Sequence, residues 1–493
     1  MSELDLENLI SEIKTYQPLA DTSVVEKAYH FAKSAHAGQK RLSGEPYFIH
    51  PLATARNLVE LKLDPTTIAA GFLHDVVEDT YTTIEQIQKE FGKEIALLVE
   101  GVTNVGKIKL RGNREEIFLE NLRKLFLVMA KDLRVVFIKL SDRLHNVETL
   151  KYVPEQKRKR IAQETLEIYA PLAERLGMGD LKGKLEDLSF PFVYPDEYKW
   201  VLEVSEKRYE ETDRQLKRAR GMLINELREA NISAEVHGRK KHLYSLYRKL
   251  LLKDRQIDLV YDLVALRVLV NTVAECYEVL GAIHKKWKPL KGLIKDYISQ
   301  PKPNGYQSLH TTVFGPEGKI FEVQIRTYEM HNVAEHGAAA HWDYSQRKSV
   351  VKNDAALDGD RGVNGASFEW VKKLASWQRM TRDSEEFKNL LKNDFFAGRI
   401  YVFSPKGDVY DLPKGATSLD FAFCVHSGLG SSCVGAKVNG RLVSLNTPLE
   451  NADLVEIIKS KNQSCPKRDW LEIVVTGEAK RKIRSSLKRF ENK

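Results

Sequence analysis

Several features that would assign this chain to a common class are missing from its sequence. No run approaches the roughly 20 apolar residues of a membrane-spanning helix, which argues against an integral membrane protein. The N-terminus is acidic and has no basic segment followed by an apolar block, so no secretory signal is predicted. The four cysteines (Cys276, Cys424, Cys433 and Cys465) lack C-x-x-C spacing, which supports neither a disulfide framework nor a zinc site. We therefore expect a cytoplasmic protein that does not bind membranes.

Two further absences narrow the choice. There is no internal repeat and no G-x-x-x-x-G-K-[ST] loop, which disfavours a P-loop nucleotide hydrolase.

At roughly 100–200 residues per domain, 493 residues predict about three domains. The net charge is +9, and residues 461–493 hold ten Lys/Arg against four Asp/Glu, a surplus of six. A basic segment of this kind is typical either of a nucleic-acid-facing surface or of a solvated helix face.

The periodicity of apolar residues changes along the chain and predicts a multidomain protein. Helical periodicity dominates the first third, a Pro-containing break falls at 189–198, and β-rich runs then alternate with helices. A polar Gly/Asp-rich stretch at 351–368 predicts a linker, and short strands with Gly/Asn/Asp turns follow. The predicted order is an all-α domain at 1–175, a helical connector at 176–200, an α+β domain at 201–345, a linker with a helix at 346–397, a small β domain at 398–460 and a basic start of a helical region at 461–493.

Histidines and carboxylates in the first domain form a candidate metal site. His50 closes the loop SGEPYFIHP, His74 and Asp75 are adjacent in GFLHDVVEDT, and Asp142 lies in IKLSDRLHN. Neighbours on a helix differ by about 100°, so His74 and Asp75 are predicted to reach one point at a helix edge. Two imidazoles with two carboxylates suit Mn²⁺ or another divalent ion. Such a metal lowers the pKa of bound water for attack at phosphorus.

A second carboxylate pair follows this motif. Glu78 is four residues after His74, and Asp79 is four residues after Asp75, which predicts both carboxylates one turn further along the same helix face. A carboxylate beside the metal can move protons during hydrolysis. Although a lone His-Asp dipeptide is usually a surface feature, the complete pattern favours a catalytic centre. The other histidines of this domain, including His145, are predicted to be structural or to face the substrate.

A basic stripe in the second domain is a candidate triphosphate site. In GRKKHLYSLYRKL, Lys241, Ser245 and Lys249 are spaced by four, so on a helix they form one stripe with Arg239 at its start. Such a stripe alone is more often a solvated helix face.

The strands near this stripe supply carboxylates. The alternation in KIFEVQIRT predicts Glu322 on the polar face of a strand, and Asp262 interrupts an apolar run predicted to be a buried strand. Together Asp262 and Glu322 suit Mg²⁺, and Glu322 is also a candidate base for a ribose hydroxyl. The loop KDYISQPKPNGYQSLH adds a candidate nucleotide-binding set in which an exposed tyrosine stacks on a purine and lysines meet phosphates: Lys295, Lys302, Asn304, Tyr306 and His310.

The runs AHAGQKRLSGEPYFIHPL, LHDVVEDT and IKLSDRLHN resemble the HD-type hydrolase domain of the Rel/SpoT homologue family, whose members make and degrade the alarmones ppGpp and pppGpp. The resemblance implies that His50, His74, Asp75 and Asp142 bind Mn²⁺. It also implies that Glu78 and Asp79 support removal of the 3′-pyrophosphate. Three residues would line the (p)ppGpp pocket: Arg41, Asn146 and Thr149. The lysine that usually follows the arginine in this family is replaced by Leu42.

The later motifs GRKKHLYSLYRK, YDLVALRV, KPNGYQSLHTTV, EVQIRT and AEHGAAAHW occur in the order of the family's synthetase domain, which resembles a nucleotidyltransferase. That domain transfers pyrophosphate from ATP to the 3′-hydroxyl of GDP or GTP and releases AMP. The resemblance implies an ATP site at Arg239, Lys241, Ser245 and Lys249, a GDP/GTP site at Lys295, Lys302, Asn304, Tyr306 and His310, and Mg²⁺ and base positions at Asp262 and Glu322. Leu293 stands where the family usually has an arginine.

Residues 399–457 resemble a TGS domain of β-grasp fold, which in this family contacts deacylated tRNA on the ribosome through a histidine at the position of His426. The zinc-finger and ACT modules that follow in long family members are not expected in these 493 residues. The resemblance implies a bifunctional alarmone hydrolase and synthetase of the stringent response. Two alternatives stay open: a hydrolase with a weak synthetase because of Leu293, and a non-catalytic protein that binds ribosomes or tRNA.

Overall fold

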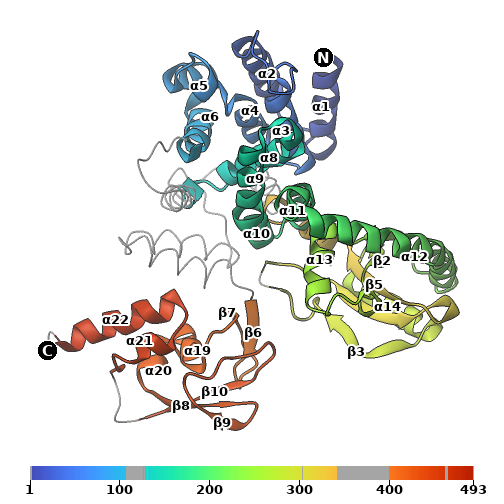
Figure 1. Cartoon of the computed structure of the whole chain (residues 1–493), viewed down its shortest axis with the longest axis vertical. Helices are drawn as coiled ribbons and strands as arrows, with labels where there is room; N and C mark the ends of the chain where they lie inside the picture. The colour runs from blue at the N-terminus through green and yellow to red at the C-terminus, as the bar shows by residue number, and fades with distance from the viewer. Residues whose placement is uncertain are drawn as a thin grey trace. The chain divides into compact units, whose positions relative to one another are not determined.

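The structure is a computed structural model that describes residues 3–106, 126, 128–129, 131–302, 304–340, 399–460 and 465–491. The chain divides into two compact units (Figure 1): Met1–Lys107 with Val128–Glu369, and Ile108–Leu127 with Trp370–Lys493. The linker predicted at 346–397 lies outside the described residues. Among the helices that the structure describes, none has the length and apolar character needed to cross a bilayer.

In the first part of unit 1 the described residues form helices joined by turns and one isolated bridge between Lys40 and Pro46, as predicted for an all-α domain. The start of its central helix α4 is set by two residues. The Asp64 side chain accepts the backbone N–H of Thr67 at 3.0 Å, and Pro65 occupies the first helical position. Residues 67–73 of α4 are all buried, and the helix packs against α2, α3 and α6. The helices of this part are α1 (Glu3–Tyr16), α2 (Ser23–Ala35), α3 (Ile49–Glu60), α4 (Pro65–Leu73), α5 (Val76–Asp79), α6 (Ile84–Gly106), α8 (Arg134–Glu148), α9 (Glu155–Glu164) and α10 (Ala170–Arg175), with a π-helical turn at Thr165–Tyr169.

Two helices connect this part to the sheet. Helix α11 (Gly179–Val193) packs against α8 and α9 on one side and against α13 (Leu243–Leu251) and α15 (Tyr328–His336) on the other. The break predicted at 189–198 is wrong in extent, because Pro191 lies inside α11 and only Tyr194 separates it from α12 (Pro195–Glu229). A proline in the last turn removes only one N–H donor from a helix that is already ending.

The second part of unit 1 is a five-stranded sheet in the order β1-β2-β5-β4-β3. The strands are β1 (Glu235–Lys240), β2 (Val264–Val270), β3 (Pro289–Asp296), β4 (Leu309–Phe314) and β5 (Ile320–Thr327), and only the β2–β5 pair is parallel. Phe321, Val323 and Ile325 of β5 enter a core formed with α12, α13 and α14 (Val273–Lys286), which confirms the predicted alternation. The opposite side of β5 therefore carries the polar side chains.

Unit 2 is a small β domain with short helices. A hairpin of β6 (Arg399–Phe403) and β7 (Val409–Pro413) accompanies a three-stranded sheet of β8 (Cys433–Val438), β9 (Arg441–Val443) and β10 (Val455–Lys459). Its helices are α19 (Ser418–Val425), α20 (Ser427–Ser431), α21 (Trp470–Ile473) and α22 (Gly477–Glu491). Ala479 and Ile483 place α22 in the core of this unit with Phe423 and Trp470.

Candidate functional site

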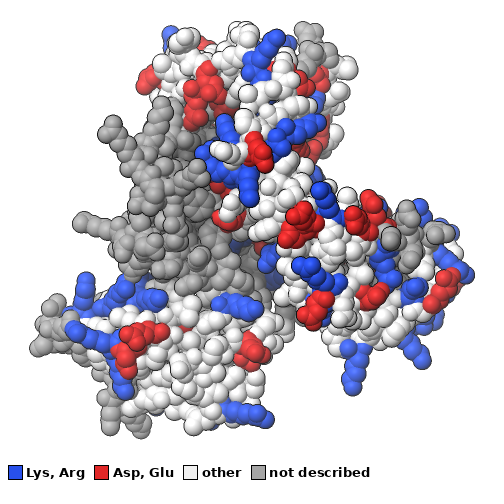
Figure 2. Space-filling model, in the orientation of Figure 1, with Lys and Arg blue, Asp and Glu red and all other residues white. Residues whose placement is uncertain are grey.

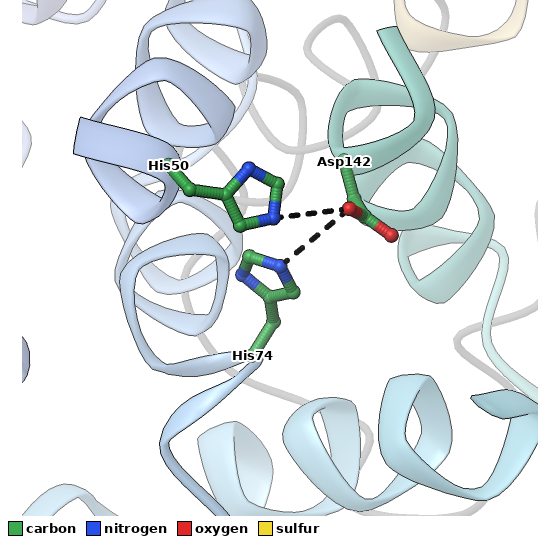
Figure 3. Close-up of side chains that lie close together, drawn as sticks. All are labelled: His50, His74 and Asp142. Atoms are coloured by element: carbon green, nitrogen blue, oxygen red, sulfur yellow. Dashed lines mark ion pairs between the residues drawn. The ribbon is translucent and has the colours of Figure 1, made fainter. Parts of the chain in front are cut away.

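Two histidines and an aspartate meet in the helical part of unit 1. His50 comes from α3, His74 follows α4, and Asp142 lies on α8, and one ligand atom of each lies within 4.8 Å of the others. Figure 3 shows both rings directed at the Asp142 carboxylate, with Asp142 Oδ1 3.1 Å from His50 Nε2 and 3.9 Å from His74 Nε2. Asp75, the fourth predicted ligand, joins them, because its carboxylate oxygens lie 3.3 Å from His50 Nε2 and 3.2 Å from His74 Nε2. The structure thus brings all four predicted ligands together.

Contacts made by the Nδ1 atoms of the two histidines fix the orientation of their rings. His74 Nδ1 lies 2.7 Å from the Gly71 carbonyl, so its Nε2 faces the cluster, where this buried atom has no hydrogen-bond partner. His50 Nδ1 lies 2.8 Å from His145 Nδ1, which orients the His50 Nε2 in the same way. An unsatisfied imidazole nitrogen beside carboxylates is the donor set that a divalent cation completes. The residues present therefore fit a metal ion.

The charges of the cluster are strongly coupled. Burial opposes ionisation of Asp142, but Lys139, 2.7 Å away, and the two imidazoles hold the pKa of this carboxyl well below its usual range. Burial lowers the pKa of His74, and burial together with the neighbouring His50 lowers the pKa of His145 to about 3. His145 is therefore neutral at neutral pH and can hold one proton between its ring and that of His50.

One detail of the predicted geometry is wrong. His74 and Asp75 do not share a continuous helix, because α4 ends at Leu73 and α5 begins at Val76, which places both residues in the turn between them. The i to i+4 relation still holds, since the Asp79 N–H donates to the Asp75 carbonyl at 2.9 Å. The Tyr47 hydroxyl lies 2.8 Å from Asp75 Oδ2 and 2.6 Å from Asp79 Oδ2, so it bridges the two carboxylates. Glu78 and Asp79 are exposed at the edge of the cluster.

The three residues predicted for the (p)ppGpp pocket also lie together. Arg41 Nη2 lies 3.3 Å from Asn146 Oδ1 and 3.4 Å from Thr149 Oγ1. Asn146 in turn donates to Asp142 at 2.5 Å, which joins this polar group to the metal cluster. Leu42, which is 69% exposed, stands in place of the expected lysine. Because leucine is uncharged, this position adds no cation to the group.

A second polar cluster lies beside the sheet. Lys241 and Lys249 both reach the Asp262 carboxylate, at 2.5 and 2.7 Å, and a pocket with a cavity volume of about 110 Å³ is lined by Arg239, Lys241, His242, Ser245, Asp262, Ala265 and Gln324. The predicted helical stripe is wrong in part: Arg239 lies on β1, Lys241 precedes α13, and only Ser245 and Lys249 are on the helix. Asp262 lies in the turn before β2 and not inside a strand, and its two lysine partners account for its burial.

Glu322 faces the same side of the sheet as the pocket. Its carboxylate lies 3.3 Å from His310 Nδ1 and accepts from Gln324 at 2.7 Å, while Gln324 also accepts from Arg239 at 3.2 Å. Burial opposes ionisation of Glu322, but these bonds leave its pKa below the ordinary value, so it is an anion at neutral pH. The register places Glu322 opposite Ala265, three residues after Asp262.

The loop before β4 gathers the other predicted nucleotide-binding residues. Lys302 Nζ lies 4.7 Å from the ring centroid of Tyr297 and 4.9 Å from that of Tyr306, and the Tyr306 hydroxyl lies 2.8 Å from His310 Nε2. Tyr306 is half-buried and not exposed as predicted. Lys295 is paired with His310 across β3 and β4, and Asn304 Nδ2 lies 3.4 Å from the Glu174 carbonyl.

The sequence interpretation missed several residues of both clusters. His145, predicted to be structural or to face the substrate, contacts His50. Tyr47 had no spacing signal that links it to the candidate metal ligands, because its contacts with Asp75 and Asp79 form only in the folded chain. Glu335 of α15 lies 3.0 Å from Arg267 and 3.1 Å from Arg326. Arg326 is 1% exposed, and burial lowers the pKa of its guanidinium to about 10. Strand alternation in KIFEVQIRT predicts Arg326 on the polar face with Glu322, but the sequence interpretation gave it no role in the site.

His426 lies in unit 2 at the start of α20. It is exposed, and its Nδ1 accepts the Gly428 N–H at 3.0 Å. The ring is therefore held in place with Nε2 as its remaining polar atom.

Comparison with known proteins agrees with this arrangement. Family models described as an HD domain, a region found in RelA / SpoT proteins and a TGS domain match residues 28–179, 238–349 and 400–459. The chain is 45% identical to a GTP pyrophosphokinase of Myxococcus xanthus over 97% of its own length and 62% of that protein. It is 46% identical to a guanosine-3′,5′-bis(diphosphate) 3′-pyrophosphohydrolase of Aquifex aeolicus, over 100% of this chain and 68% of that one.

A bifunctional (p)ppGpp synthase/hydrolase RelA of Mycobacterium tuberculosis is 45% identical over 97% of this chain and 64% of that one. The chain thus spans about three fifths to two thirds of the length of these relatives. The predicted order of a helical HD domain, an α+β synthetase-type domain and a TGS domain is confirmed. With this identity over nearly its whole length, the chain belongs to the Rel/SpoT family.

Proposed function

We propose that this chain is a bifunctional alarmone enzyme. It hydrolyses the 3′-pyrophosphate of (p)ppGpp to GDP or GTP, and it makes (p)ppGpp by transferring pyrophosphate from ATP to the 3′-hydroxyl of GDP or GTP. The observation that carries the proposal is that each of the two matched regions holds its own cluster of buried or half-buried ionisable groups: His50, His74, Asp75 and Asp142 in one, and Lys241, Lys249, Asp262 and Glu322 in the other.

In the hydrolase region, His50, His74, Asp75 and Asp142 would hold Mn²⁺, for which two imidazoles and two carboxylates are suited. A metal there supplies Lewis acidity and a more acidic bound water. Glu78 and Asp79 transfer protons at the edge of the site, and Tyr47 holds Asp79 close to Asp75. Arg41, Asn146 and Thr149 bind the nucleotide, since Arg41 presents a guanidinium that suits phosphate oxygens.

In the synthetase region, Arg239, Lys241, Ser245 and Lys249 bind the triphosphate of ATP. Asp262 and Glu322 would hold Mg²⁺, which neutralises charge on phosphate oxygens when bound. Glu322 accepts the proton of the attacking 3′-hydroxyl, a role that its anionic state allows. Tyr306 stacks on guanine, while Lys295, Lys302, Asn304 and His310 complete the GDP/GTP site.

We further propose that the hydrolase occupies 1–175, the connector 176–200, the synthetase 201–345 and the TGS domain 398–460. The protein acts in the cytoplasm, and His426 contacts deacylated tRNA on the ribosome. Arg481, Arg484 and Lys488 support an RNA-facing role for the segment that starts at 461, because all three are exposed on α22 and Figure 2 shows Lys and Arg gathered over this part of unit 2.

The deciding experiment measures AMP release from ATP with Mg²⁺ present and Mn²⁺ withheld. AMP that appears only with GDP or GTP demonstrates the synthetase and shows that Leu293 is tolerated. If no AMP appears while ppGpp is hydrolysed with Mn²⁺, the chain is a hydrolase with an idle synthetase, and Leu293→Arg becomes the next variant. Absence of both activities together with specific tRNA binding would favour the non-catalytic alternative.

A further inference from the structure

One carboxylate of the connector helix contacts a residue that lines the pocket beside the sheet. Asp187 of α11 uses both of its oxygens on α13: Oδ1 accepts the backbone N–H of Tyr244 at 2.9 Å, and Oδ2 lies 2.8 Å from His242 Nδ1. His242 lines the pocket together with Lys241 and Ser245. From the connector helix, Asp187 thus contacts a residue that lines the pocket of the proposed ATP site.

The bond to Tyr244 completes the N-terminus of α13. A helix leaves its first N–H groups unpaired, and a side chain at the N-cap usually accepts one of them. The N-cap of α13 is His242, whose own side chain makes no such bond. Asp187 supplies the missing acceptor from α11, and a carboxylate at this position also interacts favourably with the positive end of the helix dipole.

Gly183 of α11 leaves room for the His242 ring beside this contact. A Cβ atom on Gly183 would overlap the imidazole ring of His242, so the absence of a side chain there admits the ring against α11. Next to Asp187, Glu186 Oε2 accepts from the Ser245 hydroxyl at 3.3 Å, which ties a second pocket residue to the same helix.

We propose that Asp187 is a positioning residue for ATP: from α11 it caps α13 and orients His242, so that Ser245 and Lys249 are held where the triphosphate binds. The inference rests on the proposed synthetase activity. A site that is ordered before the ligand arrives avoids the ordering cost at binding, so loss of the cap should weaken ATP binding more than it slows the chemical step. Among the described residues, none of those proposed for the GDP site forms a hydrogen bond or ion pair with Asp187, whose partners are His242 and Tyr244.

The test uses the full chain and measures the KM values for ATP and GDP from AMP release. Asp187→Ala should raise the KM for ATP about tenfold, the change that corresponds to loss of one charged helix cap, with the KM for GDP unchanged. Asp187→Asn retains one acceptor oxygen for the Tyr244 N–H, so its KM for ATP should lie between that of the wild type and that of Asp187→Ala. Gly183→Ala displaces His242 from the other side and should raise the KM for ATP as well, although alanine is the better helix former.

Asp180→Ala is the matched control, because this aspartate lies on the same helix but pairs with Lys184 within α11. It should leave both KM values unchanged, and hydrolysis of ppGpp by every variant should equal that of the wild type. An unaltered KM for ATP in Asp187→Ala overturns the inference alone, and so does an equal loss of both activities, which would indicate a general folding defect. If the wild-type chain itself releases no AMP and binds no fluorescent ATP analogue, the proposed synthetase function fails and the inference with it.

Discussion

The Nδ1 atoms of His50 and His145 lie 2.8 Å apart, so one imidazole donates a hydrogen bond to the other. The two rings are also stacked, with centroids 5.0 Å apart, so His145 restrains the plane of the candidate metal ligand His50. This relationship leads directly to the first prediction.

His145→Phe should weaken Mn²⁺ binding roughly 10–100-fold, the usual effect of removing a residue that orients a metal-bound histidine. The Mn²⁺ affinity is measured by calorimetric titration and by the Mn²⁺ dependence of ppGpp hydrolysis. Excess Mn²⁺ should restore much of the hydrolase activity. His30→Phe is the control, since His30 is exposed and outside the cluster. Equal Mn²⁺ affinity in His145→Phe and the wild type would show that the ring contact has no role.

Glu78→Gln should abolish hydrolysis while leaving synthesis intact, because the amide cannot take up a proton. Release of pyrophosphate from ppGpp with Mn²⁺ is the measurement, and AMP release reports the other site. Glu85→Gln, at the start of α6, provides a neutral comparison. Wild-type hydrolysis by Glu78→Gln would contradict the assigned role.

Tyr306→Ala should raise the KM for GDP by roughly fivefold to a hundredfold, since stacking of an aromatic ring on a base contributes about 1–3 kcal/mol. Tyr306→Phe separates the ring from the hydroxyl that contacts His310, and it should retain most of the affinity for GDP. The KM for ATP is the internal reference. If Tyr306→Ala binds GDP normally, guanine lies elsewhere.

Glu186→Gln should stabilise the protein at neutral pH. Burial of Glu186, which is 4% exposed, raises the pKa of its carboxyl above the ordinary value of 4.5. The folded state then binds the proton more tightly than the unfolded state, so the free energy of unfolding falls as pH rises from the ordinary pKa through the raised one. Glutamine stays neutral throughout.

The melting temperature of Glu186→Gln should therefore exceed that of the wild type at pH 7.5, and the difference should shrink at pH 4. Glu203→Gln, an exposed change on α12, should show no such dependence on pH. A larger advantage at pH 4 than at pH 7.5 would mean that Glu186 is stabilised by its partners in the charged form.

Local patterns in the sequence were sufficient to predict the helical and β-rich order of the chain and the grouping of the candidate metal ligands, because His50, His74 and Asp142 lie in short, specific motifs. They failed where the backbone departs from a regular element. The turn at His74 and Asp75 and the strand at Arg239 both lie at element ends, where periodicity gives no signal. Contacts such as His145 with His50, or Asp187 with Tyr244, join residues far apart in sequence, and a single sequence contains no record of them.

The position of Phe190 has a practical consequence for dividing the protein. This residue of α11 is fully buried in the core of the sheet domain, with its ring among Tyr198, Tyr244 and Tyr247. A recombinant fragment that starts at Pro195 would lose that ring together with the acceptor for the Tyr244 N–H. A fragment that starts before Gly179 would retain both, although α11 would then expose to water the face that it buries against α8 and α9.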